Sequence, residues 1–148
     1  MSKENVEIVR RLYEGIDQGG VASLYGLPDA ARRQLYEQFF DPEVELVQSA
    51  ELVFDTAGTF RGYEGFVEGT RELVEGLGDI RFDVVGEPFE AGNQVVFEVR
   101  ALATGRESGI PVQTPLIAHL WELKNGLVRR WVVYPTLDEA LEAAGLSE

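Results

Sequence analysis

Residues 117–134 read IAHLWELKNGLVRRWVVY, two runs of mostly large side chains on either side of Asn125-Gly126. Asn-Gly is the strongest short-range signal for a two-residue hairpin turn, because both turn residues must accept a positive φ. With these two residues in the turn, Leu123 pairs with Val128, and the ion pair Glu122–Arg129 lies next to it. The stretch therefore predicts an antiparallel hairpin near the end of the chain.

Both faces of this hairpin are predicted to be rich in large apolar groups. In the predicted register one face carries Leu120 and Trp131, and the other carries His119 and Trp121. An antiparallel sheet with one solvated face alternates apolar with polar residues, and this hairpin does not. We therefore expect helices over one face and a second copy of the chain over the other. The residues expected at this homodimer contact are His119, Trp121, Arg130 and Tyr134.

In the rest of the chain, the spacing of apolar residues is typical of a helix in some segments and of a strand in others. Helices are expected over 3–16, 28–40, 63–76 and 137–144. Asp41-Pro42 is expected to break the chain before a strand at 44–48, and further strands are expected at 80–85, 95–104 and 112–123. Helices kept apart from a mainly antiparallel sheet define the α+β class, and 148 residues suit a single domain.

Composition excludes several kinds of site. The chain has no cysteine and only one histidine, His119, so thiolate and multi-histidine metal sites are excluded and no cofactor is expected. The formal net charge of -13 disfavours nucleic-acid binding. No apolar run approaches the ~20 residues of a membrane helix, and the charged N-terminal stretch is unlike a signal peptide. We expect a cytoplasmic protein that binds neither nucleic acid nor membrane.

Three stretches carry a resemblance to a known family. ENVEIVRRLYEGIDQGG (4–20), DPEVEL with GTFRGYEGF (41–46 and 58–66), and the hairpin with LDEALEAAGL (137–146) resemble the SnoaL-like branch of the nuclear transport factor 2-like superfamily. The resemblance spans 1–148, apart from an insertion near 22–36. It implies a cone-shaped α+β roll, with helices on the concave face of a strongly curved, mainly antiparallel sheet. It also implies an apolar pocket between them and a dimer through the opposite face.

Relatives in this family include ketosteroid isomerases, polyketide cyclases, dehydratases and epoxide hydrolases. The isomerases use a tyrosine, an aspartate base and a protonated aspartate. The resemblance puts the tyrosine at Leu12, with Tyr13 one place away, the base at Gln48 or a neighbour, and the protonated aspartate at Ala118. Leucine, glutamine and alanine side chains cannot transfer a proton to or from a carbon acid, so the isomerase mechanism is expected to be absent. Whether the chain is an enzyme stays open.

The predicted pocket is apolar, with one amide and one phenol as its polar groups. Gln48 is either an anchor for a ligand or an amide paired within the structure. Tyr13 lies either at the rim of the pocket or in the packing of its helix. His119 lies either at the dimer interface or in the pocket. The chain then binds a small hydrophobic ligand, or is a cyclase, dehydratase, isomerase or hydrolase using acid–base chemistry, or is a protein-interaction module. The pocket candidates are Leu12, Tyr13, Ile16, Leu46, Gln48, Phe66, Phe97, Val99, Leu116, Ala118, Leu120, Trp131 and Val133.

Overall fold

The computed structural model describes residues 2–24, 26–48, 58–104, 111–113 and 115–146. Its helices are α1 (Ser2–Gly19), the short 3₁₀ helix η1 (Val21–Leu24), α2 (Asp29–Phe39), α3 (Gly62–Leu77) and α4 (Leu137–Ala143). Its strands are β1 (Phe40–Gln48), β2 (Gly58–Arg61), β3 (Ile80–Ala91), β4 (Gln94–Thr104), β5 (Pro111–Gln113), β6 (Ile117–Lys124) and β7 (Leu127–Tyr134). In this described part, no helix is long and apolar enough to cross a membrane.

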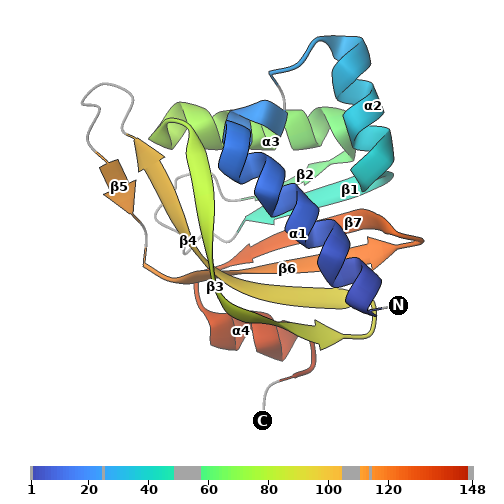
Figure 1. Cartoon of the computed structure of the whole chain (residues 1–148), viewed down its shortest axis with the longest axis vertical. Coiled ribbons are helices and arrows are strands. Elements are labelled where there is room, and N and C mark those ends of the chain that lie inside the picture. Colours follow the sequence, from blue (N-terminus) through green and yellow to red (C-terminus); the bar gives the residue numbers. More distant parts are fainter. Residues whose placement is uncertain (1, 25, 49–57, 105–110, 114, 147–148) are drawn as a thin grey trace.

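The strands form one curved sheet in the order β2-β1-β7-β6-β4-β3, with β5 paired to β4 outside this path (Figure 1). All pairs are antiparallel except β1 with β7, which run parallel. α1 packs on β3 and β4, and α3 packs on β1 and β2, so both lie against the same concave face. The predicted α+β class and the curved, mainly antiparallel sheet with helices on its concave face are confirmed.

Close approach of α3 to the sheet depends on Gly69. A Cβ atom at this position would lie 2.9 Å from Cδ2 of Leu46 and 2.8 Å from Cδ2 of Phe60. These distances are too short for ordinary packing, so a larger residue would push α3 away from β1 and β2. The glycine therefore sets how much space remains between the helix and the concave face.

The first strand corrects one prediction. Asp41-Pro42 does not break the chain; it lies inside β1, which begins at Phe40 directly after α2. The pairing with β7 shifts between Phe40 and Glu45, so Pro42 falls in an irregular part of the ladder. A proline lacks the N–H that a ladder needs, and an irregularity of this kind accommodates it.

The terminal hairpin also corrects the predicted register. Asn125 and Gly126 have φ values of 54° and 80°, and Leu123 pairs with Val128 as predicted. Beyond that pair the register shifts, because Glu122 lies opposite Arg130 rather than Arg129. The extra residue in β7 moves every later pairing by one position. Trp121 therefore lies opposite Trp131, and His119 lies opposite Val133.

The shift changes which side chains share a face. His119 and Trp121 belong to the concave face with Trp131, so their predicted place at an outer interface is wrong. Ala118 and Leu120 belong to the outer face, so their predicted place in the pocket is wrong as well. The hairpin sequence could not show this, because the extra residue in β7 puts Val128 and Trp131, three residues apart, on the same face and so breaks the two-residue alternation at the bulge.

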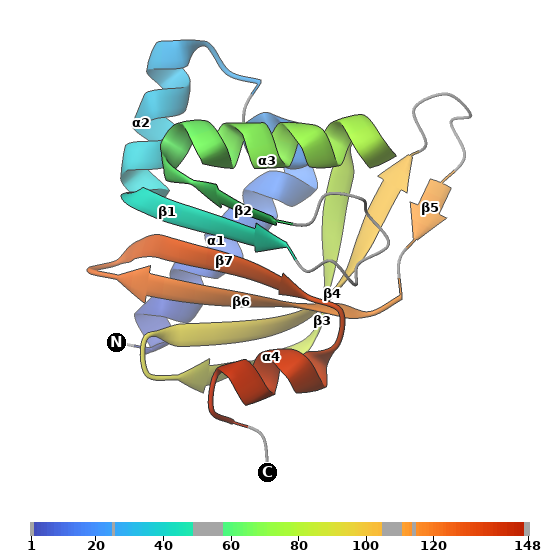
Figure 2. The ribbon, with the colours of Figure 1, turned by 180° about the vertical axis from the view of Figure 1, so that it is seen from behind.

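α4 covers the outer face of the sheet within one chain. Figures 1 and 2 show α1 and α4 on opposite sides of the strands. Under α4, the apolar residues Val96, Ala118, Leu120 and Val132 are buried together with Ala140 of the helix itself. The apolar outer face is thus explained without a second copy. The homodimer stays a prediction, and a solution mass of one chain at micromolar concentration would contradict it.

Candidate functional site

A small cavity lies between the concave face of the sheet and α3. Its volume is about 10 Å³, close to the space that one enclosed water needs and far below the ~300 Å³ or more of a typical ligand pocket. The walls are mainly apolar, so only a small group fits without movement of the walls. The residues lining it are Leu46, Gln48, Thr70, Ile80, Phe82, Ala101, Ile117, His119, Trp131 and Val133.

The predicted pocket residues divide into those at the cavity, those in the surrounding core and those elsewhere. Leu46, Gln48, Trp131 and Val133 line the cavity. Leu116 lies just before β6, is 37% exposed and is not among the residues that line this cavity. The core around the cavity contains the remaining buried candidates, Leu12, Tyr13, Ile16, Phe66, Phe97 and Val99.

Five residues of the lining are not among those predicted from the sequence: Thr70, Ile80, Phe82, Ala101 and Ile117. Ile80 and Phe82 alternate along β3, and Ala101 follows Phe97 and Val99 at two-residue spacing on β4, so strand periodicity could have indicated all three. Ile117 lies two residues before His119 on β6 and so on the same face. The incorrect hairpin register assigned both residues to the outer face. Thr70 lies one helical turn after Phe66, and its Oγ1 donates to the Phe66 carbonyl at 2.9 Å or the Val67 carbonyl at 3.1 Å.

Beside the cavity, three side chains from different elements form a buried chain of hydrogen bonds. The indole Nε1 of Trp121 donates to the hydroxyl of Tyr13 at 2.8 Å. The same hydroxyl lies 2.8 Å from Nδ1 of His119. α1 supplies the tyrosine and β6 supplies the other two, which alternate on the concave face. Tyr13 thus lies in the packing between α1 and the sheet and does not line the cavity.

The direction of the second hydrogen bond follows from the number of groups left unsatisfied. An indole N–H only donates, so the Tyr13 oxygen accepts from Trp121. If His119 Nδ1 also donated, the buried phenolic hydrogen would lack an acceptor among the described residues. The arrangement with fewer unsatisfied groups has Tyr13 donating to Nδ1 and the His119 proton on Nε2.

Burial keeps both titratable groups of this chain neutral. Removal from water lowers the pKa of His119 from 6.5 to about 3. Burial also raises the pKa of Tyr13 well above its ordinary value, and the hydrogen bond from Trp121 opposes that rise. At neutral pH the imidazole is therefore uncharged and the phenol keeps its proton.

Two ring nitrogens at the cavity are buried without a hydrogen bond. Nε2 of His119 and Nε1 of Trp131 have no partner among the described residues, although both residues line the cavity. Their rings meet edge to face, with centroids 5.2 Å apart. A buried polar group left unpaired costs about 1–3 kcal/mol, so native structures seldom keep one without a reason. Both nitrogens therefore belong to residues of the cavity wall and lack the partner that a buried donor needs.

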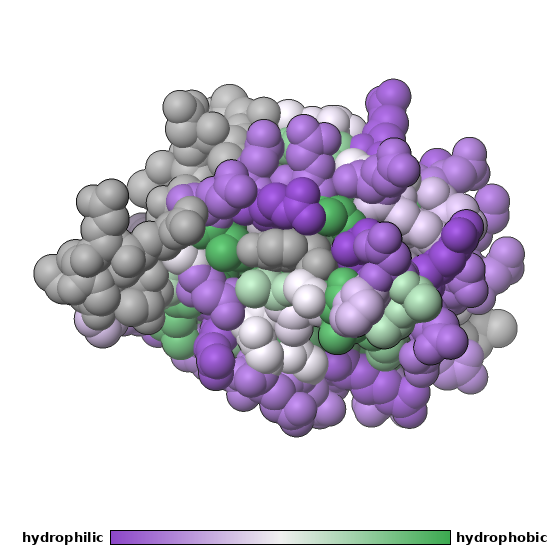
Figure 3. Space-filling model, turned by 90° about the horizontal axis from the view of Figure 1, so that it is seen from above, coloured by the Kyte–Doolittle hydropathy of each residue, from purple (hydrophilic) through white to green (hydrophobic). Residues whose placement is uncertain are grey.

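Among the residues that the structure describes, no carboxylate lines the cavity and no group of acidic or histidine side chains could hold a metal ion. The sequence offers Glu51, Asp55 and Asp83 as further candidates for an acid–base group. Asp83 is exposed on β3, and Glu51 and Asp55 lie outside the described residues. The acids of α3, Glu64, Glu68, Glu72 and Glu75, are exposed, and the face seen from above is mostly hydrophilic (Figure 3).

A larger open groove of about 340 Å³ runs between α1 and β3. Charged residues of both signs line it, among them Arg10, Asp17 and Asp83. Arg10 is already engaged, since its guanidinium lies 5.8 Å from the Phe97 ring centroid and 3.6 Å from Glu87. Tyr13, Phe82, Val84 and Phe97 supply apolar lining beside these charges, and the mixture of both signs singles out no class of ligand for this groove.

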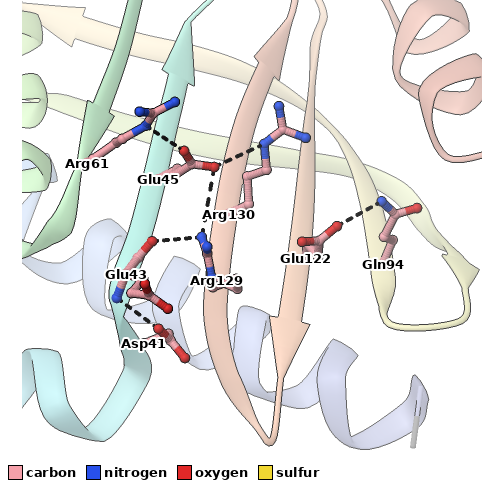
Figure 4. A network of polar contacts seen from close by, with 8 residues as sticks. All are labelled: Asp41, Glu43, Glu45, Arg61, Gln94, Glu122, Arg129 and Arg130. Carbon is pink, nitrogen blue, oxygen red and sulfur yellow. Dashed lines mark hydrogen bonds and ion pairs between the residues drawn. The ribbon is translucent and has the colours of Figure 1, made fainter.

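A second polar cluster, away from the cavity, surrounds Glu45 (Figure 4). Arg61 donates from Nε to its carboxylate at 2.8 Å, and Arg129 and Arg130 each lie 3.8 Å from it. Arg129 also donates to the Glu43 carbonyl at 2.7 Å, which ties the bulged part of β7 to β1. These contacts bind three strands together, so Arg61 has a structural role rather than that of a clamp for a negatively charged oxygen.

Comparison with known proteins agrees with this architecture. Residues 9–131 match the SnoaL-like domain family. The chain belongs to this family, as the resemblance of its helices and hairpin indicated. No curated protein sequence matches it significantly.

Solved structures show the same fold at low sequence identity. A nuclear transport factor 2-like protein of unknown function from Burkholderia pseudomallei has 16% identity and a TM-score of 0.68, covering 94% of this chain and 95% of its own. TerC, co-crystallised with polyporic acid, has 20% identity and a TM-score of 0.68, covering 96% and 98%. A protein from Catenulispora acidiphila with a ketosteroid isomerase-like fold, in complex with trimethylamine, has 17% identity and a TM-score of 0.58, covering 85% and 88%.

Proposed function

We propose that the chain binds a small hydrophobic molecule between the concave face of the sheet and α3. The observation that carries this proposal is the pair of unpaired buried nitrogens, on His119 and Trp131, beside an apolar cavity. Apolar walls with a few polar groups are typical of small-molecule sites. At about 10 Å³ the cavity accepts only one small end group, so side chains of the wall must move to admit the rest of a ligand.

Binding is favoured over acid–base catalysis by the residues present. The resemblance puts the three isomerase groups at Leu12, at Gln48 or a neighbour, and at Ala118, and the last of these lies on the outer face. His119 is the one described base at the cavity, and burial lowers its pKa to about 3, which makes it a weak proton acceptor. Two proteins of similar fold were crystallised with small organic molecules, which supports a binding role.

A thermal-shift screen with small hydrophobic ketones and alcohols tests the proposal. Ala101 is buried on β4 at the cavity wall, so Ala101→Leu fills the space that a ligand needs. The matched control is Ala30→Leu, which adds the same atoms at an exposed position of α2. We expect a ligand-induced rise in Tm for the wild type and for the control, and its loss in Ala101→Leu.

Two results would contradict the proposal. One is a wild-type protein whose Tm no compound raises. The other is an Ala101→Leu protein that folds cooperatively and keeps the full ligand-induced rise, since its ligand must then bind elsewhere. If Ala101→Leu does not fold, Ala101→Val places a smaller group at the same point and decides between these outcomes.

A further inference from the structure

We infer that His119 and Trp131 form a paired-donor site for a single acceptor oxygen, and that Tyr13 and Trp121 position it. This inference rests on the proposed ligand binding and names the chemical class of the ligand: a hydrophobic compound that carries a carbonyl or enolate oxygen. It is drawn from the hydrogen bonds and the burial of these four side chains, which lie on α1, β6 and β7.

Both nitrogens at the cavity are donors. The indole of Trp131 can only donate, and the hydrogen-bond chain leaves the His119 proton on Nε2. The two nitrogens of an imidazole direct their hydrogen bonds to roughly opposite sides of the ring, so Nε2 is turned away from Tyr13. Two unpaired donors on neighbouring rings of one cavity wall match an oxygen that only accepts.

Tyr13 and Trp121 act through His119 rather than on the ligand. Neither is among the residues that line the cavity, yet their hydrogen bonds hold the imidazole in one tautomer and one orientation. Consecutive hydrogen bonds polarise one another, so donation by Trp121 and then by Tyr13 strengthens the bond that Nε2 makes. Stacking of Trp121 on Trp131, with centroids 4.5 Å apart, fixes the second donor as well.

The space available limits what else can occupy the site. A volume of about 10 Å³ admits one oxygen-sized group near the two rings. A single enclosed water is therefore the alternative occupant, because it too can accept from both donors. Water would leave its own hydrogens to be satisfied by Gln48 or Thr70, the other polar residues of the wall.

Matched probes test the inference. We use 1-indanone and indane, which differ by one carbonyl oxygen, and measure both dissociation constants by protein-observed NMR. The wild type should bind the ketone about tenfold more tightly than the hydrocarbon, as expected for hydrogen bonds gained at a buried site. Trp131→Phe and Tyr13→Phe should lower that ratio several-fold. Tyr134→Phe, which removes a hydroxyl from the outer face, should leave it unchanged.

Spectroscopy separates a donor site from a merely structural role. Bound 1-indanone labelled with ¹³C at the carbonyl should show a lowered C=O stretching frequency, and the lowering should decrease in Trp131→Phe and Tyr13→Phe. Because His119 is the sole histidine, the ¹⁵N signals of its ring need no assignment by mutation, and they should report a proton on Nε2.

Each of the remaining outcomes would contradict a specific part of the inference or of the proposed function. Equal affinity for ketone and hydrocarbon would overturn the donor site and leave the proposed ligand binding intact. Absence of binding by either probe and by every compound of the screen would overturn both. A proton on Nδ1, or one ordered water on Nε2 that the ketone does not displace, would overturn the donor site directly.

Discussion

The two faces of the sheet are both buried, but they are built from different kinds of side chain. Under α4 the outer face buries aliphatic groups such as Val96, Leu120 and Val132, which need only close packing. Against α1 and α3 the concave face buries rings that carry heteroatoms, among them His119 and Trp131. A buried aliphatic side chain needs only close packing, whereas a buried ring nitrogen also needs a hydrogen-bond partner. The difference locates the candidate site on the concave face.

The largest effect is expected from removing a ring of the concave face. Trp121→Ala deletes a fully buried indole that stacks on Trp131 and donates to Tyr13. We expect a loss of about 4 kcal/mol in the free energy of unfolding. Urea unfolding measures it, and the ¹⁵N signals of His119 should move because the hydrogen-bond chain is broken. A loss below about 1 kcal/mol would contradict the description of this face as the main core.

A smaller loss is expected on the other face. Leu120→Ala removes a buried side chain beneath α4 and should lower the free energy of unfolding by about 3 kcal/mol. Here the ¹⁵N signals of His119 should stay in place, since no heteroatom is involved. Movement of those signals comparable to that in Trp121→Ala would show that the two faces are not independent.

The smallest effect is a pH dependence that belongs to the concave face alone. His119 has a pKa of about 3 when folded and about 6.5 when unfolded, so between these values only the unfolded chain takes up the proton. The free energy of unfolding should therefore fall as the pH falls, by up to about 1.4 kcal/mol per pH unit, and this contribution is complete above pH 6.5. Among the described residues, Tyr13 is the titratable group hydrogen-bonded to His119, and it stays protonated throughout.

The comparison protein for this measurement is His119→Phe, unfolded by urea at pH 7, 6 and 5. Carboxylates titrate in both proteins and cancel in the difference. The variant should lack the part of the slope that the imidazole contributes, whatever its own stability. Equal slopes in the two proteins would show that His119 is not buried as a neutral ring.

Much of the concave face could be predicted from local patterns. The helical stripe of α1 correctly placed Leu12 and Ile16 in the core, and alternation in β1 correctly placed Leu46 and Gln48 on its inner side. Such patterns repeat within one element, so each residue is assigned by its near neighbours. The Asn125-Gly126 turn was equally local, and both residues have the positive φ that the turn requires.

Errors arose where two elements had to be combined. The predicted alternation was correct on β6, but the bulge interrupts the alternation of β7 between Val128 and Trp131. The predicted faces of the two strands were therefore matched wrongly, and His119 was predicted on the outer face. The cover of the outer face was assigned to a second copy because α4, seven residues long, gave no sign of where it would pack.

The sequence by itself determined the fold class, the family, the helices and the hairpin turn, because periodicity and turn chemistry act over a few residues. Only the tertiary structure decided that Tyr13, His119 and Trp121 meet, since the tyrosine is separated from the other two by more than a hundred residues. One extra residue in β7 placed Trp131 beside them. Hydrogen bonds across such separations depend on how the sheet and the helices pack, which no local pattern encodes.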